Sequence, residues 1–234
     1  LCVTKIAYTS ALILPNYLPK CRLNDQNMND CILKASNKVQ LEPYLRKGIK
    51  VLDIPPFDPY KVPELNVSHT TQITSIEMRA TNIEFDKLYQ YKITSIDFRR
   101  QEGTLKGSVT FPSWAINANY DIYGTIAKIP LIGSGRTDTN ISITRCDFTI
   151  TGLNGLGNCG NVNVKIYLNV EDLNTYVYGL ALEDTTNTIL NNNSKLIASE
   201  ISPVLQQIFE KLLTRYFNNL CQKIGFNQLV SFLF

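Results

Sequence analysis

The residue types that carry out most enzymatic chemistry are scarce in this sequence. His69 is the only histidine among 234 residues, and it stands in a polar Ser-His-Thr-Thr run without a partner motif. Histidine is the commonest general base and a frequent zinc ligand, so a single copy leaves little basis for a catalytic triad or a zinc site. We expect His69 to lie in a loop or on an edge strand, and we expect no enzymatic activity, no metal and no cofactor.

One glycine motif has the spelling of a nucleotide-binding site but the wrong context. Gly155-Leu156-Gly157-Asn158-Cys159-Gly160 matches the pattern GxGxxG. A dinucleotide-binding fingerprint opens a helix whose N-terminus faces the pyrophosphate. Here alternating apolar residues from Val162 to Val170 follow the motif and predict a strand. We therefore interpret the motif as a hairpin turn.

The cysteines are the remaining residues whose spacing suggests chemistry, namely disulfide formation. The sequence has six of them. Cys21 and Cys31 lie ten residues apart and flank a polar stretch, which makes them the best candidate pair. Cys146 and Cys159 form a second possible pair, across a hairpin whose turn contains Gly152-Leu153-Asn154-Gly155. Disulfides are typical of secreted proteins rather than cytosolic ones.

The first residues have the features of the end of a secretory signal peptide. Residues 1–19 carry a single charge, and Thr9-Ser10-Ala11 places small residues where a signal peptidase cleaves. We interpret residues 1–11 as a signal-peptide remnant, and a genuine mature N-terminus is the alternative. Cys2 would be removed with this remnant. That leaves Cys221 as the odd cysteine, which we expect to be a buried free thiol on a helix.

Three Asn-x-Ser sequons support an extracellular setting. They begin at Asn66, Asn140 and Asn192. Each alone is a weak signal because such triplets arise by chance in an asparagine-rich chain. Together with the leader and the cysteines they predict a secreted, extracellular protein with glycosylation at these three asparagines.

The charge and hydropathy patterns exclude several classes of protein. Lys and Arg number 23 and Asp and Glu 20, which gives a net charge of +3, and no basic run is longer than Arg99-Arg100. A nucleic-acid-binding surface needs a concentrated basic footprint, so we expect no nucleic-acid partner. No segment reaches the roughly 18 consecutive apolar residues of a membrane-spanning helix, so we expect no transmembrane segment.

The elements that would position these residues divide into helix, sheet and helix. Between Asp25 and Lys47 apolar residues recur every three to four positions, which predicts a short N-terminal amphipathic helix. The proline-rich segment 54–63 predicts an extended connector. Residues 65–182 then carry mainly the patterns of strands.

The clearest strand pattern runs from Trp114 to Ile126. Apolar or small residues fill every second position, with polar residues such as Asn117 and Asp121 between them. This alternation predicts a strand over ~40 Å long with one buried face. A later change of parity predicts a β-bulge near Thr144-Arg145. The sheet is therefore expected to be long, antiparallel and strongly curved.

The C-terminal third changes to a helical period. From Ile189 to Ile224 apolar residues form one broad stripe, roughly 45 Å long in a helix. Ser202-Pro203 lies inside this stripe and is expected to kink or restart the helix. Together the patterns predict an α+β fold, in which a long, highly curved antiparallel β-sheet is wrapped around a long C-terminal α-helix and a short N-terminal helix precedes both.

Motifs along most of the chain point to one family. They include Leu18-Pro19-x-Cys21, Ile54-Pro55-Pro56-Phe57-Asp58-Pro59, Ile129-Pro130-Leu131-Ile132-Gly133-x-Gly135 and the C-terminal residues 217–229. In type and order these motifs resemble those of the insect Takeout / juvenile-hormone-binding-protein family. The resemblance covers about residues 17 to 230.

The resemblance implies a secreted carrier with a tubular lipid-binding fold, whose sheet and helix enclose a hydrophobic tunnel. It implies a Cys21–Cys31 disulfide, and a juvenile-hormone-like terpenoid, a fatty acid or a related lipid as ligand. We expect residues 12–234 to form one monomeric domain that circulates in haemolymph or another extracellular fluid. An extracellular interaction or signalling glycoprotein with a filled core and no ligand is the alternative.

The candidate ligand-binding residues are those expected to face the tunnel. They are Val109, Phe111, Trp114, Ile116, Tyr120 and Ile122 on the strand, and Ile201, Leu205, Ile208, Leu212 and Phe217 on the long helix. Tyr120 has the inward parity of Trp114 and carries a hydroxyl group, so it is the candidate contact for a polar head group of the ligand.

Overall fold

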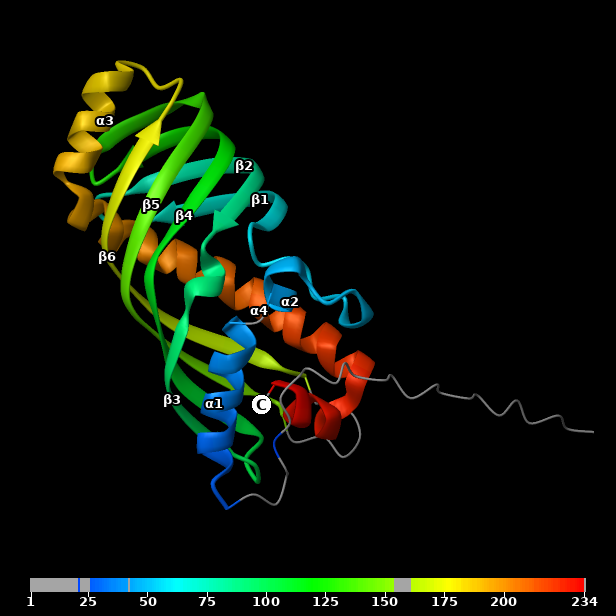
Figure 1. The fold of residues 1–234 in the computed structure, drawn as a ribbon. Helices are drawn as coiled ribbons and strands as arrows, with labels where there is room; N and C mark the ends of the chain where they lie inside the picture. The colour runs from blue at the N-terminus through cyan, green and yellow to red at the C-terminus, as the bar shows by residue number, and fades with distance from the viewer. Residues whose placement is uncertain (1–20, 22–25, 42, 154–160, 234) are drawn as a thin grey trace, which may run out of the picture.

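A strongly curved sheet wrapped around a long helix dominates the structure (Figure 1). The computed structural model describes residue 21 and residues 26–41, 43–153 and 161–233. The predicted signal-peptide remnant, Cys159 and the glycine motif at 155–160 lie outside the described residues. Within them the predicted fold class is confirmed, with a short N-terminal helix, a long antiparallel sheet and a long C-terminal helix.

The elements follow one another in the order helices, strands, helices. The N-terminal helices are α1 (Met28–Leu41), α2 (Pro43–Lys47) and the 3-10 turn η1 (Lys50–Leu52). The strands, with one further 3-10 turn, are β1 (Tyr60–Thr70), β2 (Ser75–Asp86), η2 (Leu88–Gln90), β3 (Lys92–Arg99), β4 (Thr104–Ile126), β5 (Ile129–Thr151) and β6 (Asn163–Val177). The C-terminal helices are α3 (Glu183–Asn192) and α4 (Ser194–Leu233).

Two strands of 23 residues, β4 and β5, run the length of the sheet. The strand order is β1-β2-β4-β5-β6, and all pairs are antiparallel. β2 and β3 lie on the same side of β4, because β2 pairs with its residues 115–125 and β3 with its residues 104–110. The sheet therefore has two halves, one closed by β2 and the other by β3.

The predicted alternation on β4 is confirmed by the burial of its side chains. Trp114, Ala118, Tyr120 and Ile122 are buried on the concave face, while Tyr123 on the convex face is 69% exposed. Register shifts interrupt the β4–β5 pairing between residues 109 and 114, where Pro112 lies. The β5–β6 pairing shifts between residues 142 and 145, where a bulge was predicted from the change of parity.

The C-terminal stripe forms two helices rather than one. α3 ends at Asn192 and α4 begins at Ser194, so the predicted start at Ile189 lies inside α3. α4 continues through Pro203 without a restart. Pro203 is exposed, so the carbonyl group that loses its helical partner there can be hydrated. This long helix lies on the concave side of the sheet, as Figure 1 shows in orange and red.

Polar side chains of α3 and α4 cover the free edge of β6, and we call this set the edge clamp. In each contact a backbone N–H group of residues 162–177 donates a hydrogen bond of 2.8 to 3.0 Å to a side-chain oxygen. Each of the three asparagines also donates its amide group back to the carbonyl of the same residue. A carboxamide thus replaces the peptide group of a missing strand. The clamp residues are Asn187, Asn191, Glu210, Thr214 and Asn218.

The described cysteines differ from the prediction in two of three respects. Cys21 and Cys31 form the expected disulfide, with a Cα–Cα distance of 5.9 Å. Cys146 is a buried free thiol, so a bond to Cys159 is wrong. The pairing register explains this result, because Leu168 lies opposite Cys146 and the β5–β6 turn lies beyond Thr151.

Cys221 is disulfide-bonded, and its partner lies outside the described residues. The prediction of a free thiol at Cys221 is therefore wrong. It depended on counting Cys146 among the bonded cysteines, and the count changes once Cys146 is free.

Candidate ligand-binding cavity

A cavity of about 290 Å³ lies between the concave face of the sheet and α4, in the half of the sheet that β3 closes. Apolar and aromatic side chains make up most of its wall. From the N-terminal segment, η2, β3 and the residue Tyr91 between these two, the lining residues are Ser36, Val39, Ile49, Ile54, Phe57, Leu88, Tyr91, Ile93 and Ile96. From β4, β5, β6 and α4 they are Leu105, Val109, Phe111, Trp114, Cys146, Phe148, Ile150, Val164, Ile166, Leu168, Phe209, Leu213, Tyr216 and Phe217.

The local structure of β6 and α4 explains why these side chains point inward. Successive side chains of a strand alternate between faces, so Val164, Ile166 and Leu168 share the concave face. They are 1%, 6% and 6% exposed. On α4, Phe209, Leu213 and Tyr216 follow one another at helical spacing and therefore form one stripe toward the sheet.

Four of the predicted tunnel residues line this cavity, namely Val109, Phe111, Trp114 and Phe217. The others lie outside its lining. Ile116, Tyr120 and Ile122 belong to the part of β4 that pairs with β2. Ile201, Leu205, Ile208 and Leu212 occupy α4 before and between the lining residues. Periodicity identifies the concave face, but it does not indicate where along that face space is left.

Tyr120 has a structural hydrogen bond in place of the head-group contact considered for it. Its hydroxyl group donates to the backbone carbonyl of Tyr178, the residue that follows β6. Gly135 lies opposite Tyr120 on β5. A Cβ atom at that glycine would lie 2.2 Å from the carbonyl oxygen of Tyr178, so only glycine allows the chain after β6 to approach β5 so closely.

Three aromatic rings pack at one end of the cavity. The ring of Trp114 lies 5.8 Å from that of Phe85 and 5.5 Å from that of Phe209, and the latter pair is T-shaped. Phe85 and Phe209 are 5.6 Å apart. Trp114 and Phe85 are almost fully buried, at 1% and 2% exposure. Because Phe85 belongs to β2, this cluster joins the cavity lining to the part of the core that β2 covers.

Three ionisable groups in the wall have raised pKa values and therefore favour their neutral forms. Burial raises the pKa of Tyr91, whose hydroxyl donates to the carbonyl of Ser36 at 3.3 Å. Burial also raises the pKa of Tyr216, with a smaller contribution from Tyr91. The pKa of the Cys146 thiol is raised to about 12, mainly by burial and further by the nearby Asp147. No lining residue among those described is a lysine, arginine or histidine.

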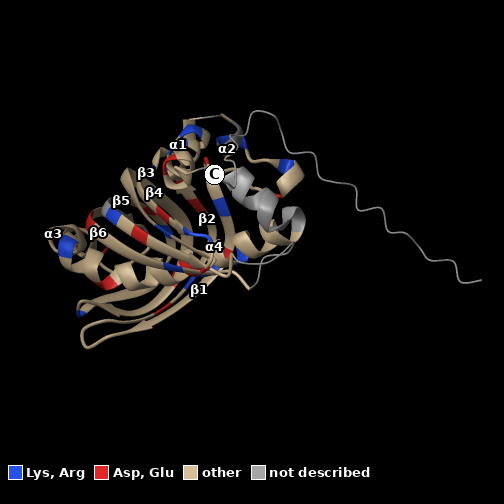
Figure 2. Cartoon of the chain, turned by 90° about the horizontal axis from the view of Figure 1, so that it is seen from below, with Lys and Arg blue, Asp and Glu red and all other residues tan. Residues whose placement is uncertain are grey.

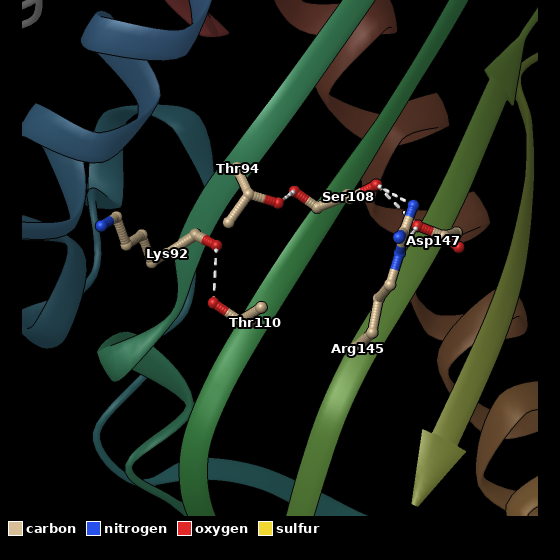
Figure 3. A network of polar contacts seen from close by, with 6 residues as sticks. All are labelled: Lys92, Thr94, Ser108, Thr110, Arg145 and Asp147. Atoms are coloured by element: carbon tan, nitrogen blue, oxygen red, sulfur yellow. Dashed lines mark hydrogen bonds and ion pairs between the residues drawn. The ribbon is translucent and has the colours of Figure 1, made fainter.

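On the convex face behind this wall, a polar network joins β3, β4 and β5 (Figure 3). Ser108 donates to Asp147 at 2.6 Å, and Arg145 donates to both residues. These contacts lower the pKa of Asp147, the bond from Ser108 most of all. Thr94 ties β3 to the carbonyl of Ser108. A serine beside a well-ionised carboxylate, without a histidine, has no efficient base, so we assign the network a structural role.

Other possible sites give little support for a different chemistry. His69 lies on the edge strand β1, opposite Ile76, as expected, but it is only partly exposed, and its Nε2 atom is buried without a partner among the described residues. Within the described part of the chain no group of His, Cys, Asp and Glu could hold a metal ion. No helix in that part is both long and apolar enough to cross a membrane. Figure 2 shows acidic and basic residues interspersed along the strands and helices.

Sequence reasoning missed the lining residues from α1 and the N-terminal connector, such as Ser36, Val39 and Phe57. Nothing in their local pattern shows that the segment folds over the open side of the sheet. It also missed Phe209 and Tyr216, because the helical period alone does not show which residues of the stripe face a cavity. Both belong to the apolar stripe of the long helix, and aromatic size at these two positions was the available signal.

Comparisons with known proteins agree with this geometry. The sequence model of the haemolymph juvenile hormone binding protein family matches residues 1–231. A search of curated proteins gives no match. Among solved structures, the crystal structure of Takeout 1 from Epiphyas postvittana is similar, with a TM-score of 0.70 and 16% sequence identity. The match covers 88% of this chain and 95% of that one, and at this identity it shows the fold alone.

Proposed function

Because the chain belongs to the haemolymph juvenile hormone binding protein family, we propose that it is a secreted carrier that holds a single small hydrophobic ligand between its sheet and α4. The proposed ligand class comprises juvenile-hormone-like terpenoids, fatty acids and related lipids. The protein would bind such a ligand without changing it chemically, and it would act as a monomer.

The observation that carries this proposal is the apolar cavity of about 290 Å³. Ligand pockets in proteins are concave, mostly apolar and typically ~300–1,000 Å³ in volume, so this cavity is of the size that suits one small lipid. Burial of the ligand's apolar surface would supply most of the binding energy, at about 25 cal/mol per Å². A protein with a completely filled core would not leave this space, and the cavity therefore counts against the alternative of a signalling glycoprotein without a ligand.

Two features support secretion. The Cys21–Cys31 disulfide is of a kind that persists in oxidising compartments. The three sequon asparagines, Asn66, Asn140 and Asn192, are all exposed, so each could be reached by a glycosyl transferase. We therefore propose haemolymph or another extracellular fluid as its location, with glycans at these positions.

The proposal can be tested by ligand binding in the wild-type protein and in two matched variants. Ile166→Phe adds volume to a lining residue and should reduce the space for a ligand. Ile132→Phe makes the same change at a convex-face residue that is 53% exposed. We expect Ile166→Phe to weaken uptake of N-phenyl-1-naphthylamine, an uncharged fluorescent probe, by at least ~10-fold, which corresponds to ~1.4 kcal/mol. Ile132→Phe should bind the probe as the wild type does.

Thermal unfolding of both variants provides the control for folding. Filling a cavity usually leaves a protein as stable or more stable, so a lower affinity of Ile166→Phe with an unchanged melting temperature would support the cavity as the binding site. Organic extraction of the natively purified wild-type protein, followed by mass spectrometry, would identify a carried lipid. Equal probe binding by wild type and Ile166→Phe would contradict the proposed site.

A further inference from the structure

Among the described residues, the cavity wall contains a buried polar atom that has no hydrogen-bond partner. The indole nitrogen Nε1 of Trp114 is buried, and no described protein group accepts a hydrogen bond from it. Its residue lines the cavity and is 1% exposed. Buried N–H groups are nearly always paired in native proteins, because leaving one unpaired costs about 1–3 kcal/mol. An unpaired donor in the wall of a ligand cavity is therefore a candidate contact for the ligand itself.

The neighbours of Trp114 do not remove the need for a partner. Phe85 and Phe209 pack against its ring system, and neither side chain has a lone pair to accept a hydrogen bond. The T-shaped contact with Phe209 offers at most an N–H···π interaction, which is weaker than a bond to oxygen. A ligand oxygen inside the cavity would be the better acceptor.

The rest of the wall restricts the charge of that oxygen. A buried carboxylate needs a cation or several donors, and the described lining residues include no lysine, arginine or histidine. The raised pKa values of Tyr91, Tyr216 and Cys146 show that burial in this wall already disfavours negative charge on three different groups. An unpaired neutral donor with no cation in the described lining suits an uncharged acceptor.

We propose that the cavity selects an uncharged lipid with a hydrogen-bond acceptor, such as an ester or ketone oxygen, and that the indole N–H of Trp114 donates to this oxygen. This inference rests on the proposed carrier function and narrows its ligand class. It separates neutral esters and ketones from ionised fatty acids, which the same apolar volume would otherwise accept.

The experiment uses three probes of similar chain length: methyl laurate as the ester, tridecane as the hydrocarbon and laurate, at pH 8, as the carboxylate. Binding of each is measured by displacement of N-phenyl-1-naphthylamine from the full chain. Trp114 is the only tryptophan in the sequence, so ¹⁵N-labelled protein has a single indole N–H signal in its NMR spectrum. Methyl laurate should move this signal downfield, and tridecane should not.

A matched replacement isolates the N–H group. Biosynthetic replacement of the single tryptophan by β-(3-benzothienyl)alanine puts sulfur in place of N–H and keeps the ring shape. Loss of one hydrogen bond should weaken methyl laurate binding by ~5- to 10-fold and leave tridecane binding unchanged. Because methyl laurate and tridecane are each compared between two proteins, differences in their solubility cancel. Laurate should bind wild type at least ~100-fold more weakly than methyl laurate.

The outcomes distinguish the two proposals. If methyl laurate and tridecane bind, but the replacement affects both equally and the indole signal does not move with the ester, the carrier function stands and the role of Trp114 is refuted. If laurate binds at pH 8 as tightly as the ester, selection for an uncharged ligand is refuted. If N-phenyl-1-naphthylamine and all three lipids fail to bind, the carrier function itself fails, and this inference fails with it.

Discussion

Replacing Asn187 by alanine should destabilise the fold by about 2–4 kcal/mol, because this residue is the most deeply buried asparagine of the edge clamp. Asn187 is 3% exposed. Its side-chain oxygen accepts a hydrogen bond from the N–H of Val177 at 2.8 Å, and its amide donates to the carbonyls of Val177 and Glu183 at 3.0 Å each. Each such bond contributes ~1 kcal/mol net, and an unpaired backbone group adds a penalty of similar size.

Urea denaturation followed by far-UV circular dichroism measures this loss, from the midpoint and slope of the transition. Asn169→Ala is the matched control, since it makes the same change at an exposed position of β6, the strand that the clamp holds, and leaves all three sequons intact. The control should change the free energy of unfolding by less than about 0.5 kcal/mol. An Asn187→Ala variant as stable as the control would show that water replaces the clamp bonds at no cost, and the reasoning would then be wrong.

Two further predictions concern single residues of the concave face. The thiol of Cys146, with a pKa raised to about 12, should react with iodoacetamide in the folded protein at pH 8 at least ~1,000-fold more slowly than an unperturbed cysteine, and the rate should rise about tenfold for each pH unit. Mass spectrometry of the alkylated protein measures this rate, and rapid labelling would contradict the burial of the thiol. Tyr120→Phe removes the bond to the carbonyl of Tyr178 and should lower the free energy of unfolding by ~1 kcal/mol without changing the affinity for N-phenyl-1-naphthylamine. Weaker binding of the probe would instead restore Tyr120 as a ligand contact.

The helices and strands could be predicted where one face of an element is buried and the other is hydrated, because this contrast sets the order of apolar and polar residues. On β4 one face is buried and the other hydrated, so the run from Trp114 to Ile126 shows both the strand and its orientation. The bulge in β5 was predictable because inserting one residue moves every following side chain to the other face. These signals are local, and each can be read from a few neighbouring residues.

The position of the cavity could not be predicted in this way. It depends on which parts of β4, α4 and the N-terminal segment lie opposite one another, and these are separated by tens to more than a hundred residues. Val109 and Ile122 are both apolar residues of β4, yet only Val109 lines the space. The prediction of a disulfide at Cys146 failed for the same reason. The β5–β6 register determines the neighbour of Cys146, and the spacing of the cysteines does not reveal that register.

The edge clamp also relates two different spacings. Glu210, Thr214 and Asn218 are four residues apart, about 6.0 Å along a helix, while their partners on β6 are two residues apart, about 6.6 Å along a strand. The mismatch is only ~0.6 Å per contact, so flexible side chains can absorb it over a few contacts but not over the whole strand. On the other side of the break between the two helices, the two clamp asparagines of α3 are again four residues apart.

Because the spacing of the clamp residues on α4 nearly equals the spacing of their partners on β6, the helix and the strand are held in one register. Sliding the helix by one residue along the strand would misalign all its clamp bonds at once. A bulkier cargo is therefore expected to displace the opposite side of the cavity, where α1 and β3 are joined through Asn37 and Ile93. We therefore expect α4 and β6 to form the side of the cavity that keeps its geometry when a ligand binds.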